Sequence, residues 1–298
     1  MKYRIIGDIH ARKNWHKLVE PFDENTIYIF LGDYTDPYYG WEDVTYEQMI
    51  EEINAILQFK RDHLENVILL SGNHDVQYWI GKGDTNRYDY KHKDEIGKLF
   101  KDNKHLFDDI AYSIKDKYLI THAGVTFDWY SSRVKHGKEH EVIGKEPLSS
   151  MCEQINQLWK TNKELFTFSA NATKMSDYYG DSSLHSPIWI RPVSLWEHNV
   201  FGWTSGIIQI VGHTPFESFR NPDADGRIGT FCTDKRLATP EEIDKGRNYY
   251  LLDGAFICSL VENGKENEEI IFVDCLRTET ACVEVDDETL EWKIVTVK

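Results

Sequence analysis

Residues 26–36 read TIYIFLGDYTD, an apolar run of strand length (26–31) that ends abruptly in glycine and aspartate. The same form occurs twice more, because residues 3–10 read YRIIGDIH and residues 67–75 read VILLSGNHD, with expected strands at 3–6 and 67–70. Residues 42–60 lie between the second and third runs and repeat apolar side chains at helical spacing. Apolar strands that alternate with helices indicate a mostly parallel sheet, and such sheets bind ligands at the carboxyl ends of their strands. Functional residues are therefore expected directly after each strand.

The rest of the chain predicts a second sheet. The ranges with strand-like patterns are 118–121, 207–211, 249–252, 256–260, 269–274, 281–285 and 292–297. Tight polar turns such as residues 262–265 (ENGK) indicate antiparallel pairing of the C-terminal strands, which would build a second sheet against the first. A further helix is expected at 151–168.

The length of 298 residues allows two small domains or one large one. We interpret residues 1–298 as a single α/β domain with insertions around 77–93 and 169–206. Both insertions lack a clean period, which is typical of long loops or small subdomains.

Composition excludes several classes of protein. Apolar residues make up 41% of the chain and aromatic residues 13%, which is too much buried-type surface for a disordered chain. The formal charge of −16 repels polyanions, so duplex nucleic acid is not an expected partner. No run approaches the roughly 18 consecutive apolar residues of a membrane-spanning helix. The five cysteines form no Cys-x-x-Cys pair, and the first ten residues contain no signal-peptide pattern, so we expect a cytoplasmic protein with free thiols.

Five short motifs fall at the ends of expected strands, each with a glycine beside Asp, Asn or His. They are Gly7-Asp8-Ile9-His10, Gly32-Asp33-Tyr34-Thr35-Asp36, Gly72-Asn73-His74-Asp75, Thr121-His122-Ala123-Gly124 and Gly212-His213-Thr214-Pro215. Glycine lets the backbone turn sharply, and the carboxyl ends of parallel strands meet at one edge. The five motifs together predict a pocket of metal ligands.

The order and spacing of these motifs resemble those of the calcineurin-like metallophosphoesterases, and most closely the Ser/Thr protein phosphatases with their bacterial and phage relatives. The resemblance spans nearly the whole chain and implies a sandwich of two stacked mixed sheets flanked by helices. It also implies two divalent cations, one held by Asp8, His10 and Asp33. The other would be held by Asp33, Asn73, His122 and His213, so that Asp33 bridges the pair. Such mixed oxygen and imidazole ligation suits Mn²⁺, our leading expectation, or Fe or Zn²⁺, better than Ca²⁺.

The resemblance implies hydrolysis of a phosphate monoester, in a phosphoprotein or a small molecule, by in-line attack of a metal-bridging hydroxide. His74 would give a proton to the leaving group, and Asp36 would fix the tautomer of that histidine. Residue 37 is a proline, whereas the protein phosphatases have a phosphate-binding arginine at this position. The candidate phosphate-binding residues are therefore Asn73, Arg191, which resembles an arginine of some bacterial relatives, and Arg12.

Two alternative functions remain open at this point. The first is a phosphodiesterase or dinucleoside polyphosphate hydrolase, although the last motif lacks the second histidine of the nuclease and phosphodiesterase branches. The second is a non-catalytic binding module, which the retained ligands and His74 argue against.

Three groups of residues outside the motifs have ordinary structural interpretations. Tyr34 is expected to pack in the core. Aromatic residues in the second insertion are expected to form a small core; they are Trp189, Trp196, Phe201 and Trp203. The basic residues after the third motif are interpreted as a solvated face rather than a rim of the site; they are Lys82, Arg87, Lys91 and Lys93.

Overall fold

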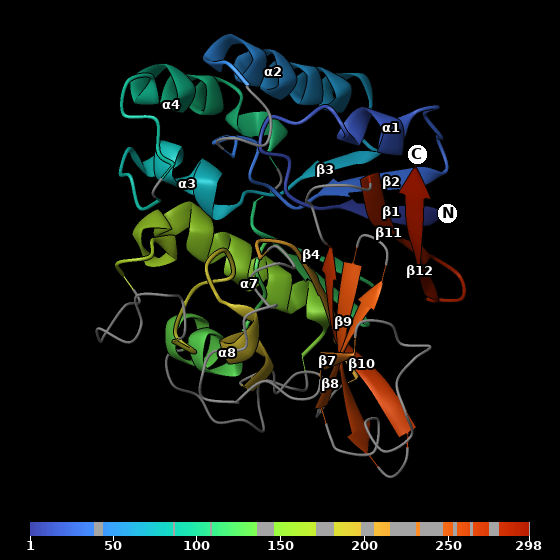
Figure 1. The fold of residues 1–298 in the computed structure, drawn as a ribbon. Helices are drawn as coiled ribbons and strands as arrows, with labels where there is room; N and C mark the ends of the chain where they lie inside the picture. Colours follow the sequence, from blue (N-terminus) through green and yellow to red (C-terminus); the bar gives the residue numbers. More distant parts are fainter. Residues whose placement is uncertain are drawn as a thin grey trace.

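Two stacked β-sheets with helices on both outer faces make up the computed structural model of the protein (Figure 1). The structure describes residues 1–38, 44–85, 87–107, 109–135, 146–170, 182–197, 206–214, 231–232, 247–252, 255–262, 265–273 and 280–297. The α/β class and the four-layer arrangement expected from the sequence are confirmed.

The first sheet has the strand order β12-β11-β1-β2-β3. Its strands are β1 (Lys2–Ile6), β2 (Thr26–Phe30), β3 (Val67–Leu69), β11 (Thr280–Asp286) and β12 (Trp292–Val297). Strands β1, β2 and β3 are parallel, and β11 pairs antiparallel with both β1 and β12. Both ends of the chain therefore lie beside this sheet (Figure 1).

The second sheet has the order β4-β5-β6-β10-β9-β8-β7. Its strands are β4 (Ala111–Ile114), β5 (Tyr118–Thr121), β6 (Ile208–Val211), β7 (Phe231–Cys232), β8 (Arg247–Leu252), β9 (Ala255–Glu262) and β10 (Lys265–Val273). Strands β5 and β6 are parallel, as are β6 and β10, whereas β9 and β10 form the antiparallel pair that the turn at 262–265 predicts.

The helices cover the two outer faces. Around the first sheet lie α1 (Trp15–Val19), α2 (Tyr46–Asp62), α3 (Asn73–Ile80) and α4 (Lys93–Asp102). Packed against the second sheet are α5 (Phe127–Trp129) and α7 (Leu148–Thr161), and α8 (Pro192–Glu197) lies in the same half of the molecule (Figure 1). Helix α2 begins where it does because the Thr45 hydroxyl accepts from the Gln48 N–H in a capping box.

Side-chain alternation along the strands builds three layers of core. Ile5 of β1 faces the second sheet, whereas its neighbour Ile6 faces the helices. Ile29 of β2 likewise points inward, between Tyr28 and Phe30, which point outward. This two-residue period explains why apolar residues run without interruption in strands that are buried on both faces.

Three expectations need correction. Strand β11 pairs with β1, and β12 pairs with β11, so both strands belong to the first sheet and not to the second. Local pattern did not predict this, because it does not encode a non-local partner. Residues 77–80 belong to helix α3, so the first insertion begins only after Ile80. The expected helix at 151–168 starts at Leu148 and ends at Thr161, followed by a 3₁₀ turn at Lys163–Phe166. Strand β4 was not expected, and residues 42–43, 171–181 and 198–205 lie outside the described residues.

A search of the described helices for a membrane-crossing segment found none of sufficient length and apolar character.

Candidate metal centre

Polar side chains from five loops meet where the parallel strands of the two sheets end. Asp8 follows β1, Asp33 follows β2, and Asn73 opens α3 just after β3. The second sheet contributes His122 directly after β5 and His213 just after β6. All five side chains are buried, as is His10. The strand-end position expected from the sequence is therefore where the structure places these residues.

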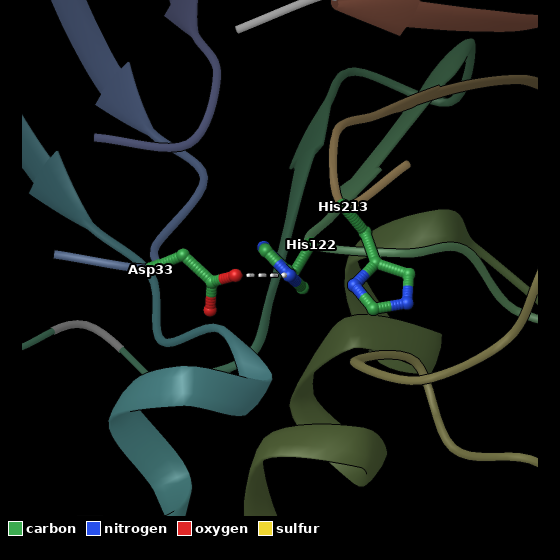
Figure 2. Close-up of side chains that lie close together, drawn as sticks. All are labelled: Asp33, His122 and His213. Atoms are coloured by element: carbon green, nitrogen blue, oxygen red, sulfur yellow. Dashed lines mark ion pairs between the residues drawn. The ribbon is translucent and has the colours of Figure 1, made fainter. Parts of the chain in front are cut away.

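These side chains form two groups that share Asp33. In one group, ligand atoms of Asp8, His10 and Asp33 all lie within 4.8 Å of one another, and in the other those of Asp33, His122 and His213 do. The Asp33 carboxylate points at the His122 ring, with Oδ2 3.4 Å from Nε2, and His213 lies beyond that ring (Figure 2). The same oxygen is 3.5 Å from Nε2 of His10.

Asn73 belongs to the second group. Its side-chain oxygen lies 3.0 Å from Nε2 of His122 and 3.0 Å from Nδ1 of His213. Within the part of the chain that the structure describes, the buried Nε2 of His213 has no hydrogen-bond partner. A buried polar atom without a partner is costly, and so many donor atoms facing one another fit a site that holds a cation.

Two of the imidazoles are oriented by backbone carbonyls. Nδ1 of His10 donates to the Thr35 carbonyl at 2.8 Å, and Nδ1 of His122 donates to the Leu31 carbonyl at 3.0 Å. These bonds place the proton on Nδ1 and leave Nε2, which faces Asp33, as the electron-pair donor. This outer hydrogen bond is the usual support of a metal-binding histidine.

The backbone around the site is strained. His10, Asp33, Asp36 and His213 have φ values of 46°, 54°, 56° and 68°, in the left-handed region that non-glycine residues rarely adopt. A Cβ added to Gly72 would lie 2.2 Å from Oδ1 of Asp33, so only glycine fits there. Strain of this kind persists when the surrounding structure enforces it, and it concentrates at functional sites.

The electrostatics of the group match metal binding. Burial opposes ionisation of Asp33, but His122 and His74 outweigh it and hold the pKa of this carboxyl well below its usual range. Burial first, then the charge of Arg87, lowers the pKa of His10, and burial followed by Arg191 does the same for His213. Ionised carboxylates and neutral imidazoles are the forms that bind metals.

His122 differs from the other two imidazoles. Burial lowers its pKa, but Asp33 and Asp8 outweigh that effect and raise it to about 9. In the absence of an ion this histidine is therefore protonated at neutral pH. A cation bound at the same place would replace that proton.

Asp75 links the loop after β2 to the loop after β3. No role was predicted for this residue. Its carboxylate accepts from the backbone N–H groups of Asp33 at 2.7 Å, Tyr34 at 2.9 Å and Gly72 at 2.9 Å. The signal was present in the Gly-Asn-His-Asp motif, because an acidic residue at the third position of a helix commonly accepts from the N-cap.

We expect Asp75→Ala to destabilise the protein by about 3 kcal/mol or more, because three buried N–H groups lose their acceptor at about 1–3 kcal/mol each. Asp75→Asn keeps one acceptor oxygen, so its free energy of unfolding should lie between those of Asp75→Ala and the wild type. Urea unfolding would measure the difference, with Asp102→Ala on the exposed end of α4 as the control. A loss no greater than that of the control would contradict this role of Asp75.

His74 and Asp36 form a dyad beside the first group. Nδ1 of His74 lies 2.7 Å from Oδ2 of Asp36, and the His74 ring lies edge-on to His10 with centroids 5.1 Å apart. The same carboxylate accepts from the Gln77 amide and the Tyr78 hydroxyl, each at 2.5 Å. Burial raises the pKa of Asp36 despite these donors. The carboxylate therefore fixes the orientation of His74 and the proton on its Nδ1.

Three arginines have different hydrogen-bond partners in the structure. Arg191 donates to the Thr214 hydroxyl at 3.2 Å, next to His213, whereas Arg12 donates to the backbone carbonyls of Asp8 and Ile9. Arg87 was interpreted as part of a solvated face, but its Nη2 lies 3.0 Å from Nε2 of His74. The sequence gave no signal for this contact. Arg87 lies in a loop, and the conformation of that loop, which brings Arg87 to the site, has no local period.

Two of the remaining interpretations hold where the structure describes the residues, and one does not. Tyr34 is buried and its hydroxyl donates to the Leu70 carbonyl. Lys82, Lys91 and Lys93 are exposed. Trp189 packs in the main core of the second half, and not in a small core of the insertion, with its ring centroid 6.2 Å from that of His213. Phe201 and Trp203, and the side chain of Trp196, lie outside the described set.

Comparison with known proteins identifies the family of this chain. A family model described as calcineurin-like phosphoesterase matches residues 1–214, which include every candidate ligand. No curated protein matches the chain. Among the solved structures, a protein serine/threonine phosphatase from Saccharomyces cerevisiae with similarity to human phosphatase PP5 aligns at 14% identity and a TM-score of 0.41, covering 99% of this chain and 79% of that one. The family match over residues 1–214, with the ligand motifs gathered as described, shows that the chain belongs to the calcineurin-like phosphoesterases.

Proposed function

We propose that the protein hydrolyses phosphate monoesters with the help of two divalent metal ions. The observation that carries the proposal is the position of Asp33, whose carboxylate is common to two groups of three buried ligands. A second support is the His74–Asp36 dyad, which lies beside these groups and whose residues are in neither of them. Membership of the calcineurin-like phosphoesterase family supports the interpretation of both features as parts of one site.

The donor set suits Mn²⁺, and Fe or Zn²⁺ are the other candidates. Asp8, His10 and Asp33 would hold one ion, and Asp33, Asn73, His122 and His213 the other. Carboxylate oxygens, an amide oxygen and imidazole nitrogens are ligands of such intermediate ions, and no cysteine lies in any of the motifs. When bound, such a pair would activate water and offset the charge of the phosphate.

The chain's own residues then perform three tasks. With substrate bound, His74 takes up a proton from water on Nε2 and gives it to the leaving oxygen, while Asp36 holds the opposite ring nitrogen so that Nε2 points toward the centre. Arg191, which lies beside His213, and the side-chain amide of Asn73 would donate to phosphate oxygens. The burial of the ligands excludes competing water from the site.

Hydrolysis of p-nitrophenyl phosphate and bis(p-nitrophenyl) phosphate in Mn²⁺ tests the proposal. We expect turnover of the monoester, its loss after EDTA treatment, and its return when Mn²⁺ is added back. The reason is that the groups around Asp33 consist of ligands that are costly to bury together without a cation.

A faster reaction with the diester would instead favour a phosphodiesterase or dinucleoside polyphosphate hydrolase. Failure to hydrolyse either compound, or any member of a panel of phosphorylated compounds, would favour a binding module on the same fold. The last motif supports the monoester, because it contains a single histidine.

A further inference from the structure

Arg87 lies against the dyad with its guanidinium held on three sides. Nη1 donates to the backbone carbonyl of Asp36 at 2.5 Å, and Nη2 donates to Nε2 of His74 at 3.0 Å. The ring of Tyr38 stacks under the guanidinium, whose carbon is 3.6 Å from the ring centroid. An arginine with this many contacts is an ordered part of the site and not a solvated surface residue.

The loop that carries Arg87 is fastened to the same carboxylate that orients His74. The side-chain oxygen of Gln77 accepts from the backbone N–H groups of Asp84 at 3.3 Å and Thr85 at 3.2 Å, while its amide donates to Asp36. On the other side of Arg87, the Tyr78 hydroxyl accepts from the Asp89 N–H at 2.8 Å and donates to Asp36. Asp36 therefore positions both His74 and the loop that carries Arg87.

The charge of Arg87 is not neutralised by these contacts. Its hydrogen-bond acceptors are a carbonyl oxygen and an imidazole nitrogen, and among the described residues no carboxylate lies within ion-pair distance of its guanidinium. The Asp36 carboxylate is already bound by three other side chains. A half-buried guanidinium with this arrangement is suited to an anion that arrives from outside the chain.

The contact with His74 also indicates where that anion sits. Nε2 of His74 is the atom that the proposed function turns toward the leaving oxygen, so the Nη2 donor must leave it when substrate binds, and Nε2 then takes up a proton from water. A phosphate oxygen next to the leaving oxygen is the nearest acceptor of suitable charge. Nη1 can keep its bond to the Asp36 carbonyl, since a guanidinium offers donors on two nitrogens at fixed spacing.

We propose that Arg87 is a phosphate-binding residue of this site, which transfers its Nη2 donor from His74 to a non-bridging oxygen of the bound phosphate. The inference rests on the proposed function. It places one guanidinium on the His74 side of the centre, while Arg191 lies on the His213 side.

Titration of inorganic phosphate into the Mn²⁺-loaded protein, followed by calorimetry, tests this directly. We expect Arg87→Ala to weaken phosphate binding by about 10- to 100-fold, since a charge-assisted bond to the anion is lost. Arg87→Lys should restore only part of the affinity, because an ammonium cannot hold the Asp36 carbonyl and the phosphate together. Lys91→Ala, which removes the same charge from an exposed position of the same loop, should change the affinity by about twofold or less.

Phosphate affinity in Arg87→Ala equal to that of the wild type, with metal content and the unfolding midpoint unchanged, would show that other groups hold the anion and would overturn the inference. Absence of phosphate binding in the wild type would overturn it as well. The two proposals can fail separately. A wild-type protein that hydrolyses no monoester, but whose phosphate affinity depends on Arg87, would refute the proposed function and support this inference.

Discussion

Asp33→Asn is expected to abolish turnover and to reduce the bound metal from two ions to one or none. The carboxylate belongs to both groups of candidate ligands, so a single substitution affects both. A neutral amide cannot supply the shared negative charge, and the loss of several kcal/mol of transition-state stabilisation slows the reaction by about 10³-fold or more.

The fold is expected to survive this change. Asparagine has nearly the same shape, and the backbone N–H of residue 33 keeps its bond to Asp75. The proton on His122 should become easier to lose, because Asp33 is the largest influence that raises its pKa. The substitution therefore separates metal binding from stability.

Metal analysis by mass spectrometry, together with monoester turnover, measures the effect. Asp102→Asn on the exposed end of α4 is a matched control, since its carboxylate contacts only the exposed Lys98 in the described structure. A variant that keeps two equivalents of Mn²⁺ and most of its activity would show that Asp33 is not shared between two ions.

Local sequence pattern was sufficient to place the candidate ligands at the ends of their strands. Each strand that precedes a motif, such as 26–31, shows the continuous apolar run of a strand buried on both faces, and a parallel arrangement brings the strand ends together. The ligand motifs could therefore be placed at one edge before any geometry was known. His122 and His213 come from the second sheet, and they complete the site because the inter-sheet core, with Ile29 and Ile210, holds the two sheets together.

Non-local features could not be predicted in this way. The pairing of β1 with β11 joins residues about 280 positions apart, as Lys2 with Asp286, and no local period encodes that choice. The placement of Arg87 is a similar case. Pro37 follows Asp36, so Arg191 and Arg12 were the expected phosphate-binding arginines. Arg87 was interpreted as part of a solvated loop, since basic residues interspersed with acidic ones are typical of such a loop. Only the anchoring of that loop by Gln77 and Tyr78 brings Arg87 to His74.

His74→Ala is expected to keep both metal ions and to slow the reaction according to the leaving group. His74 contacts Asp36 and Arg87 through its two ring nitrogens, and neither candidate group of metal ligands includes it. Loss of a proton donor costs about 10²- to 10⁴-fold when the leaving group needs the proton. The fall should therefore be large for phenyl phosphate and much smaller for p-nitrophenyl phosphate, whose leaving group is stable as an anion.

Comparison of the two esters in the wild type, His74→Ala and His105→Ala distinguishes proton donation from a structural role. His105 is exposed, so its replacement should leave both rates unchanged. A structural role for His74 would slow both esters by the same factor, because distortion of the centre does not depend on the leaving group. Equal losses for the two esters, or full activity with phenyl phosphate, would show that the proton reaches the leaving oxygen from another source.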